Sequence, residues 1–311
     1  MSGAAPFFAD IAEAPEGQEC RWLTASDGVR LRAAFWRKGA KGTVLLFPGR
    51  TEYIEKYGPA AGEFASRGYA MITLDWRGQG LSDRPLSDPM TGHIAAFGDF
   101  QRDVAALVAL ARAEKLPEPY FLLTHSMGGA IGLRALYDGL PVKAAVFSAP
   151  MWGIRIHPAL RPAAWVLSTL SRPLKRGHLY APGTAAVTYV LEAGFGENML
   201  TRDPAMFEFM RRQVTAHPDL ALGGPSLHWL NEALRECLDL RRRPSPDLPC
   251  YTALGLLERV VDPVPIHARM ARWPKGELDL IAGAEHEVMM EAPAIRARFY
   301  DKAAALFDRS R

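Results

Sequence analysis

The first half of the chain alternates short apolar runs with segments long enough to form helices. The apolar runs are TVLLFPG (43–49), YAMITLDW (69–76), YFLLTHS (120–126) and KAAVFSAP (143–150). Between them, residues 97–115 carry apolar side chains at helical spacing, and a second helical segment, 55–67, ends at Gly68. Because such alternation is typical of a parallel sheet covered by helices on both faces, it predicts a fold of the α/β class.

The pattern also predicts how the chain is divided. Residues 19–37 alternate in polarity around an Asp-Gly pair, which indicates a β-hairpin ahead of the parallel strands. Strands and helices return at the C-terminal end, in segments 248–255, 263–271, 277–283 and 292–308. We therefore expect a core of residues 1–150 and 248–311 with a mostly parallel central sheet, interrupted by a helical cap of residues 151–247.

Composition and targeting signals exclude several classes of protein. With 49% hydrophobic and 23% charged residues, the chain is neither disordered nor a coiled coil. Its formal net charge of +3 is too small to indicate a nucleic-acid binder. The three cysteines are widely spaced, which predicts free thiols rather than disulfides or a metal site. No signal peptide or membrane-spanning run is recognisable, so we expect a cytoplasmic protein, with peripheral contact at the inner membrane surface left open.

The small positive charge is not spread evenly. The predicted core contains 25 basic and 25 acidic residues, and the predicted cap contains 12 basic and 9 acidic residues. Within the cap, residues 162–176 combine Trp165, Val166 and Leu170 with three basic residues. This segment is either an ordinary amphipathic helix with a solvated face or a surface that rests on anionic lipid.

The segment from Phe121 to Ala130 predicts a nucleophilic serine. A buried strand runs directly into Ser126, and a helix with Gly128 and Gly129 in its first turn follows. A nucleophile elbow needs this arrangement, because the tight turn tolerates only small neighbours. The usual pattern has glycine two residues before the serine, where this chain has Thr124. The alternative is a serine that only caps a helix.

A serine nucleophile needs a general base and an acid that orients it. Of the eight histidines, His286 fits best, because it follows the last predicted strand at the sheet edge where Ser126 lies. His125 precedes the serine and should point away into packing. Two carboxylates follow the preceding strand, Glu258 and Asp262. We assign Glu258 as the acid and Asp262, which precedes a proline and a helix, as the helix cap, with the reverse assignment as the alternative.

Stabilisation of a tetrahedral oxyanion requires two N–H donors. The backbone N–H of Met127, directly after the nucleophile, is one candidate, and that of Arg50, in the loop after the strand 43–47, is the other. The Arg50 side chain is either a solvated loop residue or a partner for an anionic group of the substrate. We expect no cofactor and no metal.

Together these residues resemble the α/β-hydrolase superfamily over essentially the whole chain. The segments most similar to its bacterial lysophospholipase and monoacylglycerol lipase branch are FPGRTEYIEKY (47–57), LDWRGQGLSDR (74–84), DPMTGHIAAFGDF (88–100), LTHSMGGA (123–130), ERVVDP (258–263) and EHEVMMEAP (285–293). The resemblance implies hydrolysis of fatty-acyl esters of glycerol or glycerophospholipid without a cofactor. It also implies Ser126, Glu258 and His286 as the triad, with Arg50 and Met127 as oxyanion donors.

The expected function is therefore that of a serine hydrolase that cleaves carboxylic esters through an acyl-enzyme, with lysophospholipid or monoacylglycerol as substrate. Aromatic and methionine side chains in the predicted cap suit an acyl chain. A small-ester carboxylesterase or a peptidase on the same fold is the first alternative. A non-catalytic binding protein with this fold is the second.

Overall fold

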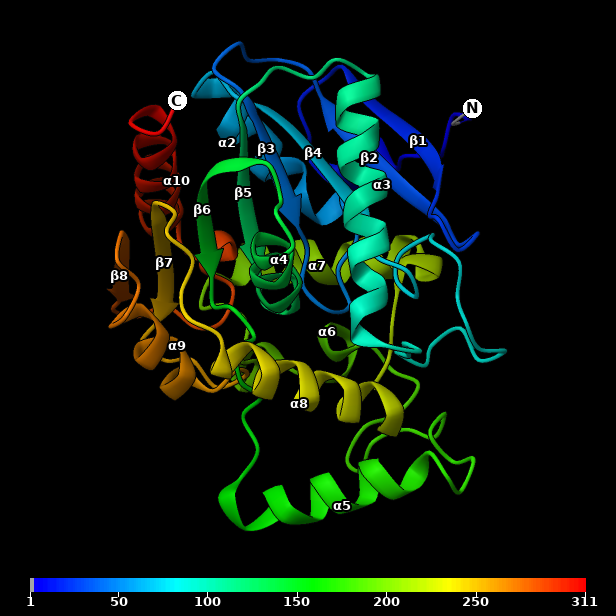
Figure 1. Ribbon diagram of the computed structural model, residues 1–311. Helices are drawn as coiled ribbons and strands as arrows, with labels where there is room; N and C mark the ends of the chain where they lie inside the picture. Colours follow the sequence, from blue (N-terminus) through cyan, green and yellow to red (C-terminus); the bar gives the residue numbers. More distant parts are fainter. Residues whose placement is uncertain (1–2) are drawn as a thin grey trace.

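The computed structural model describes residues 3–311 and is built on one eight-stranded sheet (Figure 1). The strands are β1 (Gln18–Thr24), β2 (Arg30–Trp36), β3 (Thr43–Phe47), β4 (Ala70–Asp75), β5 (Tyr120–His125), β6 (Val142–Ser148), β7 (Cys250–Gly255) and β8 (Gly276–Ile281). Their order across the sheet is β1-β2-β4-β3-β5-β6-β7-β8. β2 pairs antiparallel with both β1 and β4, and every other pairing is parallel. The predicted fold class is confirmed.

The burial of each strand follows from its apolar sequence. Every residue of β3, β4 and β5 is buried, as expected for central strands with helices on both faces. The predicted hairpin is β1 and β2, whose turn contains Gly28 at φ +89°, a conformation that glycine adopts without strain. At the opposite edge, β8 leaves half of its residues exposed.

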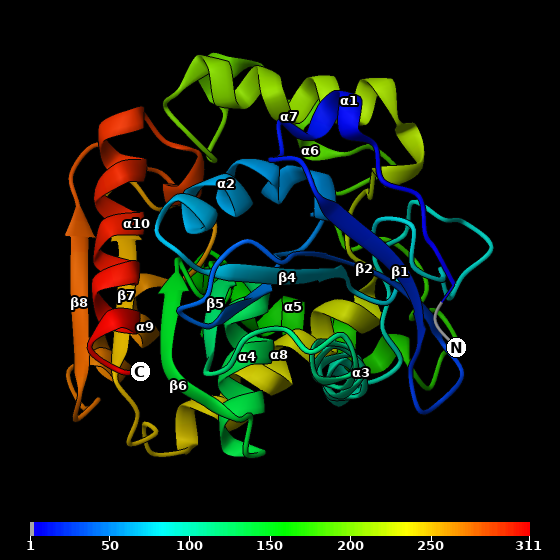
Figure 2. The ribbon, with the colours of Figure 1, turned by 90° about the horizontal axis from the view of Figure 1, so that it is seen from above.

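Helices cover both faces of the sheet, as Figure 2 shows from above. The α-helices are α1 (Ala9–Ala12), α2 (Gly58–Ser66), α3 (Phe100–Ala113), α4 (Met127–Tyr137), α5 (Arg161–Ser171), α6 (Tyr189–Glu192), α7 (Pro204–Ala216), α8 (Leu227–Arg242), α9 (Pro263–Met270) and α10 (Pro293–Asp308). Successive residues of β3 point to opposite faces, so Leu45 and Phe47 pack with α3, α4 and α8, whereas Val44 and Leu46 pack with α2 and α10. The sheet is thus the middle layer of three.

Residues 151–247, called the cap segment below, contribute helices α5 to α8 and no strand of the sheet. Helix α8 packs on α4, where Trp229 and Ala233 join the same hydrophobic cluster as the sheet. Helix α5 packs on α8 and lies beyond it at the margin of the molecule (Figure 1). Because α8 shares a core with α4, the division into two domains at residues 151 and 247 stays a prediction.

The cysteine prediction is confirmed: Cys20, Cys237 and Cys250 are free and buried. Burial in apolar surroundings raises the pKa of the Cys20 and Cys237 thiols to about 12, which keeps them protonated and unreactive at neutral pH. Among residues 3–311, no helix combines the length and the apolar character that crossing a bilayer requires.

Candidate active site

The turn between β5 and α4 is strained at Ser126, which adopts φ 48° and ψ −117°. A non-glycine residue in this region of backbone space costs about 1–3 kcal/mol, and such strain persists where the surrounding structure enforces it. A side chain at Gly128 would overlap the carbonyl oxygen of Phe47, and one at Gly129 would overlap Pro150. The Ser126 side chain makes no capping hydrogen bond to α4, so the helix-cap alternative is not supported.

Thr124, the departure from the usual elbow pattern, is accommodated by a glycine on the helix. A Cβ atom at Gly132 would lie 2.7 Å from Cγ2 of Thr124. The missing side chain on α4 therefore leaves room for the threonine methyl group on β5. The elbow keeps its close strand–helix packing because the glycine lies on α4 instead of β5.

The structure brings Ser126, His286 and Glu258 together in one chain of hydrogen bonds. Nε2 of His286 lies 2.9 Å from Oγ of Ser126, and its Nδ1 lies 2.7 Å from Oε2 of Glu258. His286 follows β8 and Glu258 follows β7, so both reach the edge of the sheet at which β5 ends. Both are buried, whereas Ser126 is half-buried and lines a cavity.

Glu258 is held as a carboxylate. Its Oε1 accepts hydrogen bonds from the backbone N–H groups of Val260, at 2.6 Å, and Val261, at 3.0 Å. Burial opposes ionisation, but the neighbouring His286 and these two donors outweigh it and lower the pKa of Glu258. An ionised carboxylate at this position fixes the orientation of the imidazole and stabilises its protonated form.

Asp262, the alternative acid, is placed at the start of α9. Its side chain accepts a hydrogen bond from the N–H of Val264 at 3.1 Å and lies 3.3 Å from Arg161. This is a helix N-cap, in which a carboxylate satisfies an otherwise unpaired N–H group. No hydrogen bond or ion pair joins Asp262 to His286 in the part of the chain that the structure describes.

Arg50 and Met127 line the same cavity as Ser126 and His286. Met127 is the first residue of α4, where N–H groups have no partner within the helix. Among residues 3–311, the backbone N–H of Arg50 donates no hydrogen bond. Both N–H groups are therefore available to a ligand at Ser126.

The loop that carries Arg50 is held by Gln79, which the sequence analysis did not single out. Its Nε2 donates to the carbonyl oxygen of Gly49 at 3.0 Å, and its Oε1 accepts from the N–H of Thr51 at 3.2 Å. Gln79 belongs to the segment RGQG (77–80), which begins one residue beyond the end of β4, the strand next to β3. A glutamine after a buried strand was the available signal, since a side-chain amide can bridge two backbone groups.

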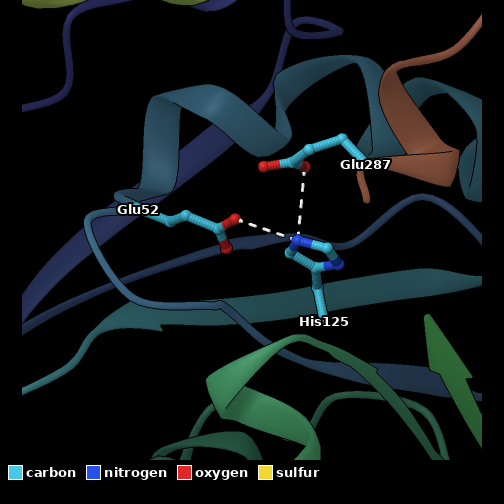
Figure 3. A group of neighbouring side chains, drawn as sticks. All are labelled: Glu52, His125 and Glu287. Atoms are coloured by element: carbon cyan, nitrogen blue, oxygen red, sulfur yellow. Dashed lines mark ion pairs between the residues drawn. The ribbon is translucent and has the colours of Figure 1, made fainter. Parts of the chain in front are cut away.

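Below the elbow lies a buried ionic cluster of Glu52, Lys56, His125 and Glu287. Figure 3 shows Glu52, His125 and Glu287 of this cluster. Nζ of Lys56 lies 2.8 Å from Glu52 and 2.6 Å from Glu287. Both carboxylates point toward Nε2 of His125, at 3.4 Å each, and all four side chains are buried. His125 is thus in packing, as predicted, although its surroundings are ionic.

Three members of this cluster have the spacing of a metal site. Ligand atoms of Glu52, His125 and Glu287 all lie within 4.8 Å of one another. The ammonium group of Lys56, however, contacts both carboxylates directly. An ammonium group already contacts both carboxylates and supplies part of their counter-charge, so the donor set does not fit a metal ion and no step is assigned to one.

The cavity at Ser126 has a volume of about 260 Å³. Apolar side chains dominate its lining, among them Met127, Met151, Val190, Leu200, Met210 and Val214. The cap segment closes one side of it and is attached to the loop of the histidine: the N–H of His286 donates to the carbonyl of Met199, and that of Glu287 to Leu200 at 2.8 Å. A small apolar chamber of this kind suits a hydrocarbon chain.

Comparison with known sequences gives consistent matches. The family model described as serine aminopeptidase, S33, matches residues 38–293. Lysophospholipase L2 of Escherichia coli K12 is 31% identical, over 82% of this chain and 76% of that protein. The probable lysophospholipase L2 of Haemophilus influenzae is 29% identical, over 81% of this chain and 79% of that protein.

Solved structures share the fold at lower identity. A soluble variant of monoglyceride lipase from Saccharomyces cerevisiae superposes with a TM-score of 0.71 at 20% identity, covering 93% of this chain and 94% of that one. A monoacylglycerol lipase from Paleococcus ferrophilus superposes with a TM-score of 0.69 at 17% identity, covering 90% and 99%. At these identities the likeness shows the fold alone.

Proposed function

The chain belongs to the serine aminopeptidase S33 family of α/β-hydrolases, and on this premise we propose that it is a serine ester hydrolase acting on lysophospholipids. The observation that carries the proposal is the hydrogen-bonded series Ser126–His286–Glu258 at the wall of an apolar cavity. A hydroxyl becomes a nucleophile when an adjacent base accepts its proton and a third group orients that base.

In the first half of the proposed reaction, Oγ of Ser126 attacks the ester carbonyl while Nε2 of His286 takes the hydroxyl proton. The N–H groups of Met127 and Arg50 donate to the oxygen that becomes negative. Glu258 stabilises the imidazolium formed on His286. Collapse of the tetrahedral intermediate breaks the bond to the alcohol, which leaves with the proton from Nε2, and an acyl group remains on Ser126.

The second half returns the enzyme to its starting state. His286 accepts a proton from a water molecule, and the resulting hydroxide attacks the acyl carbonyl. The same two N–H groups stabilise the second oxyanion. The bond to Oγ then breaks, Ser126 recovers the proton from His286, and the carboxylic acid leaves. No cofactor takes part in this scheme.

The substrate class follows from the relatives and the cavity together. The two relatives described above are a lysophospholipase L2 and a probable lysophospholipase L2. The apolar lining of the cavity favours a fatty-acyl chain over the polar backbone of a peptide. A monoacylglycerol has the same acyl chain and ester. It is the second candidate class because two of the structures named above are a monoglyceride lipase and a monoacylglycerol lipase.

A lipid substrate raises the question of how the protein meets a membrane, and helix α5 offers a surface. Large apolar side chains on and beside α5 are exposed to solvent: Leu160, Val166, Leu167, Leu170 and Leu174. Arg172, Lys175 and Arg176 follow the helix and are also exposed. Apolar side chains flanked by cations are typical of a helix that lies on an anionic membrane surface, and we propose this peripheral contact for α5.

A hydrolysis screen tests the proposed reaction. The wild-type protein and Ser126→Ala are compared on a lysophosphatidylcholine, the matching monoacylglycerol, p-nitrophenyl acetate and an aminoacyl p-nitroanilide. We expect the highest kcat/KM on the lysophospholipid and a loss of at least about 10³-fold in the variant. Preference for the anilide would contradict the proposal, as would full activity in Ser126→Ala with unchanged circular dichroism.

A further inference from the structure

Arg50 carries a charge that no acidic side chain neutralises. No carboxylate of residues 3–311 lies within ion-pair distance of its guanidinium group. Nη2 donates to the carbonyl oxygen of Gly223, and the group lies 5.3 Å from the ring centre of Trp229. Nε is buried and has no hydrogen-bond partner within the described chain. The cation therefore has only neutral partners among the described residues.

The surrounding backbone is shaped to admit this guanidinium. A Cβ atom at Gly92 would lie 3.1 Å from both Cζ and Nε of Arg50. The N–H of Gly92 donates to the carbonyl of Gly224 at 2.9 Å, which fixes the two glycine segments against each other. Gly223 and Gly224 come from the cap segment and Arg50 from the loop after β3, so the guanidinium lies where the cap segment meets the core.

An uncompensated cation of this kind is costly. Removing a charge from water without a counter-charge is unfavourable, and burial lowers the pKa of Arg50 to about 10. The group still keeps its proton at neutral pH. A half-buried, charged and unpaired side chain in the wall of a reaction cavity indicates a ligand of opposite charge.

The position of Arg50 relative to Ser126 suggests which ligand. Both residues line the same cavity, and the backbone N–H of Arg50 is the proposed oxyanion donor. In a lysophospholipid, a three-carbon glycerol unit separates the reacting ester from a phosphodiester. One arginine can then contact the reacting oxygen through its backbone and the phosphodiester through its side chain. A monoacylglycerol has a hydroxyl in place of this anion.

We propose that the Arg50 guanidinium binds the phosphodiester of the substrate and so selects lysophospholipids over monoacylglycerols. The inference rests on the proposed ester hydrolysis. Arginine suits the task because its planar group donates two parallel hydrogen bonds to phosphate oxygens. The loop residue that supplies an oxyanion donor thus also determines specificity.

The test compares kcat/KM for decanoyl lysophosphatidylcholine and monodecanoylglycerol, below their micellar concentrations, in wild type, Arg50→Gln and Arg50→Lys. The ratio of kcat/KM for the lysophospholipid to kcat/KM for the monoacylglycerol cancels any general damage to the oxyanion loop. We expect Arg50→Gln to lower the ratio by about 10- to 100-fold, as loss of a charged hydrogen bond implies. Arg50→Lys should lose less. The matched control is Arg112→Gln, an exposed arginine on α3, which should keep the wild-type ratio. An equal loss on both substrates overturns the proposal.

A second arm distinguishes the phosphodiester from the other anion in the reaction, the fatty-acid product. Decanoate is tested as an inhibitor of wild type and Arg50→Gln. Weaker inhibition in the variant together with an unchanged substrate ratio would assign Arg50 to the carboxylate and overturn the proposal.

Binding to Ser126→Ala, measured by calorimetry, separates this proposal from the proposed reaction. The ligands are 1-O-decyl-glycero-3-phosphocholine and decyl glyceryl ether, which contain no carboxylic ester and differ only in the phosphocholine group. Arg50→Gln in this background should weaken binding of the phosphocholine ligand only, by a similar factor, whether or not the wild type hydrolyses lysophospholipid. Equal weakening of both ligands, or no weakening, contradicts the role of Arg50.

Discussion

Nζ of Lys56 lies 2.6 Å from the carboxylate of Glu287, the residue that directly follows His286. The same ammonium contacts Glu52, whose carboxylate accepts a hydrogen bond from the N–H of Gly49 in the loop of Arg50. His125, the residue before Ser126, completes the group. One buried ionic cluster therefore joins the loops of the nucleophile, the base and the oxyanion donor, and its Glu52, Lys56 and Glu287 also line the cavity.

Removing the ammonium should destabilise the whole protein. Lys56→Met leaves two buried carboxylates without their cation, and breaking a buried pair in this way costs about 3–5 kcal/mol. We expect this loss in the free energy of unfolding measured with urea. Lys302→Met is the control, because Lys302 forms ion pairs at the surface and should cost at most about 1 kcal/mol. Equal losses in the two variants would show that the cluster has no special role.

The cluster also predicts a pH dependence centred on His125. Burial lowers its pKa, but Glu287 and Glu52 outweigh burial and the repulsion of Lys56, so the net effect raises the pKa. Protonation therefore stabilises the folded state fully below the pKa of an unfolded histidine, about 6.5. This stabilisation is lost as the pH rises through the raised folded pKa. The neighbouring ring of His286, 4.8 Å away between ring centres, belongs to the same environment.

The measurement compares unfolding free energies of wild type and His125→Asn from pH 6 to pH 10. The difference between them should be largest at pH 6 and shrink as the pH rises. His267→Asn, at an exposed position on α9, should show no such trend. If the difference between wild type and His125→Asn stays constant over this pH range, protonation of His125 does not stabilise the folded state.

The assignment of the acid is tested by two conservative variants. Glu258→Gln keeps the size of the side chain but removes the charge that orients His286, and kcat should fall by about 10³- to 10⁴-fold. Asp262→Asn should keep kcat within a few-fold of wild type, because asparagine also caps helices well. A larger loss of kcat at Asp262 than at Glu258 would reverse the assignment.

The packing of Thr124 against Gly132 predicts an energetic coupling. Gly132→Ala should be destabilising by about 1–3 kcal/mol, because the new methyl group meets Cγ2 of Thr124. In Thr124→Ala/Gly132→Ala that methyl group is gone. The double variant should then be more stable than the sum of the single effects predicts, by at least about 0.5 kcal/mol in thermal or urea unfolding. Strict additivity of the two effects would mean that Gly132 does not accommodate the methyl group of Thr124.

The proposed membrane contact of α5 is tested by co-sedimentation with vesicles. Leu170→Ser/Leu174→Ser should bind phosphatidylglycerol vesicles several-fold more weakly than wild type, and added salt should weaken wild-type binding. Leu256→Ser/Val264→Ser removes two equally exposed apolar side chains elsewhere and should bind like wild type. Similar binding by all three proteins would show that α5 does not contact the membrane.

What the sequence could predict depended on whether the signal was local. The buried strand that leads to Ser126 and the edge strand that precedes His286 can each be recognised from a few consecutive residues, and the sheet confirms both. The pairing of Lys56 with Glu287 could not be predicted. In the sequence, Lys56 stands four residues after Glu52, and such a pair is typical of a solvated helix face. These side chains are buried by segments distant in the sequence, and that burial cannot be seen in a local pattern.

The same limit applied to Arg50. Its place in the loop after the first parallel strand gave the backbone donor, but the sequence left the side chain undecided between solvent and a ligand. Only the approach of Gly92 and Gly223 from distant segments shows that the guanidinium is half-buried with no carboxylate beside it.

The most direct test of the account is the site of covalent labelling by a fluorophosphonate, located by mass spectrometry of tryptic peptides. The account predicts a single modified residue, Ser126, with labelling abolished in Ser126→Ala and strongly slowed in Glu258→Gln. Folded wild-type protein that remains unlabelled, or a label on any other residue, would contradict it.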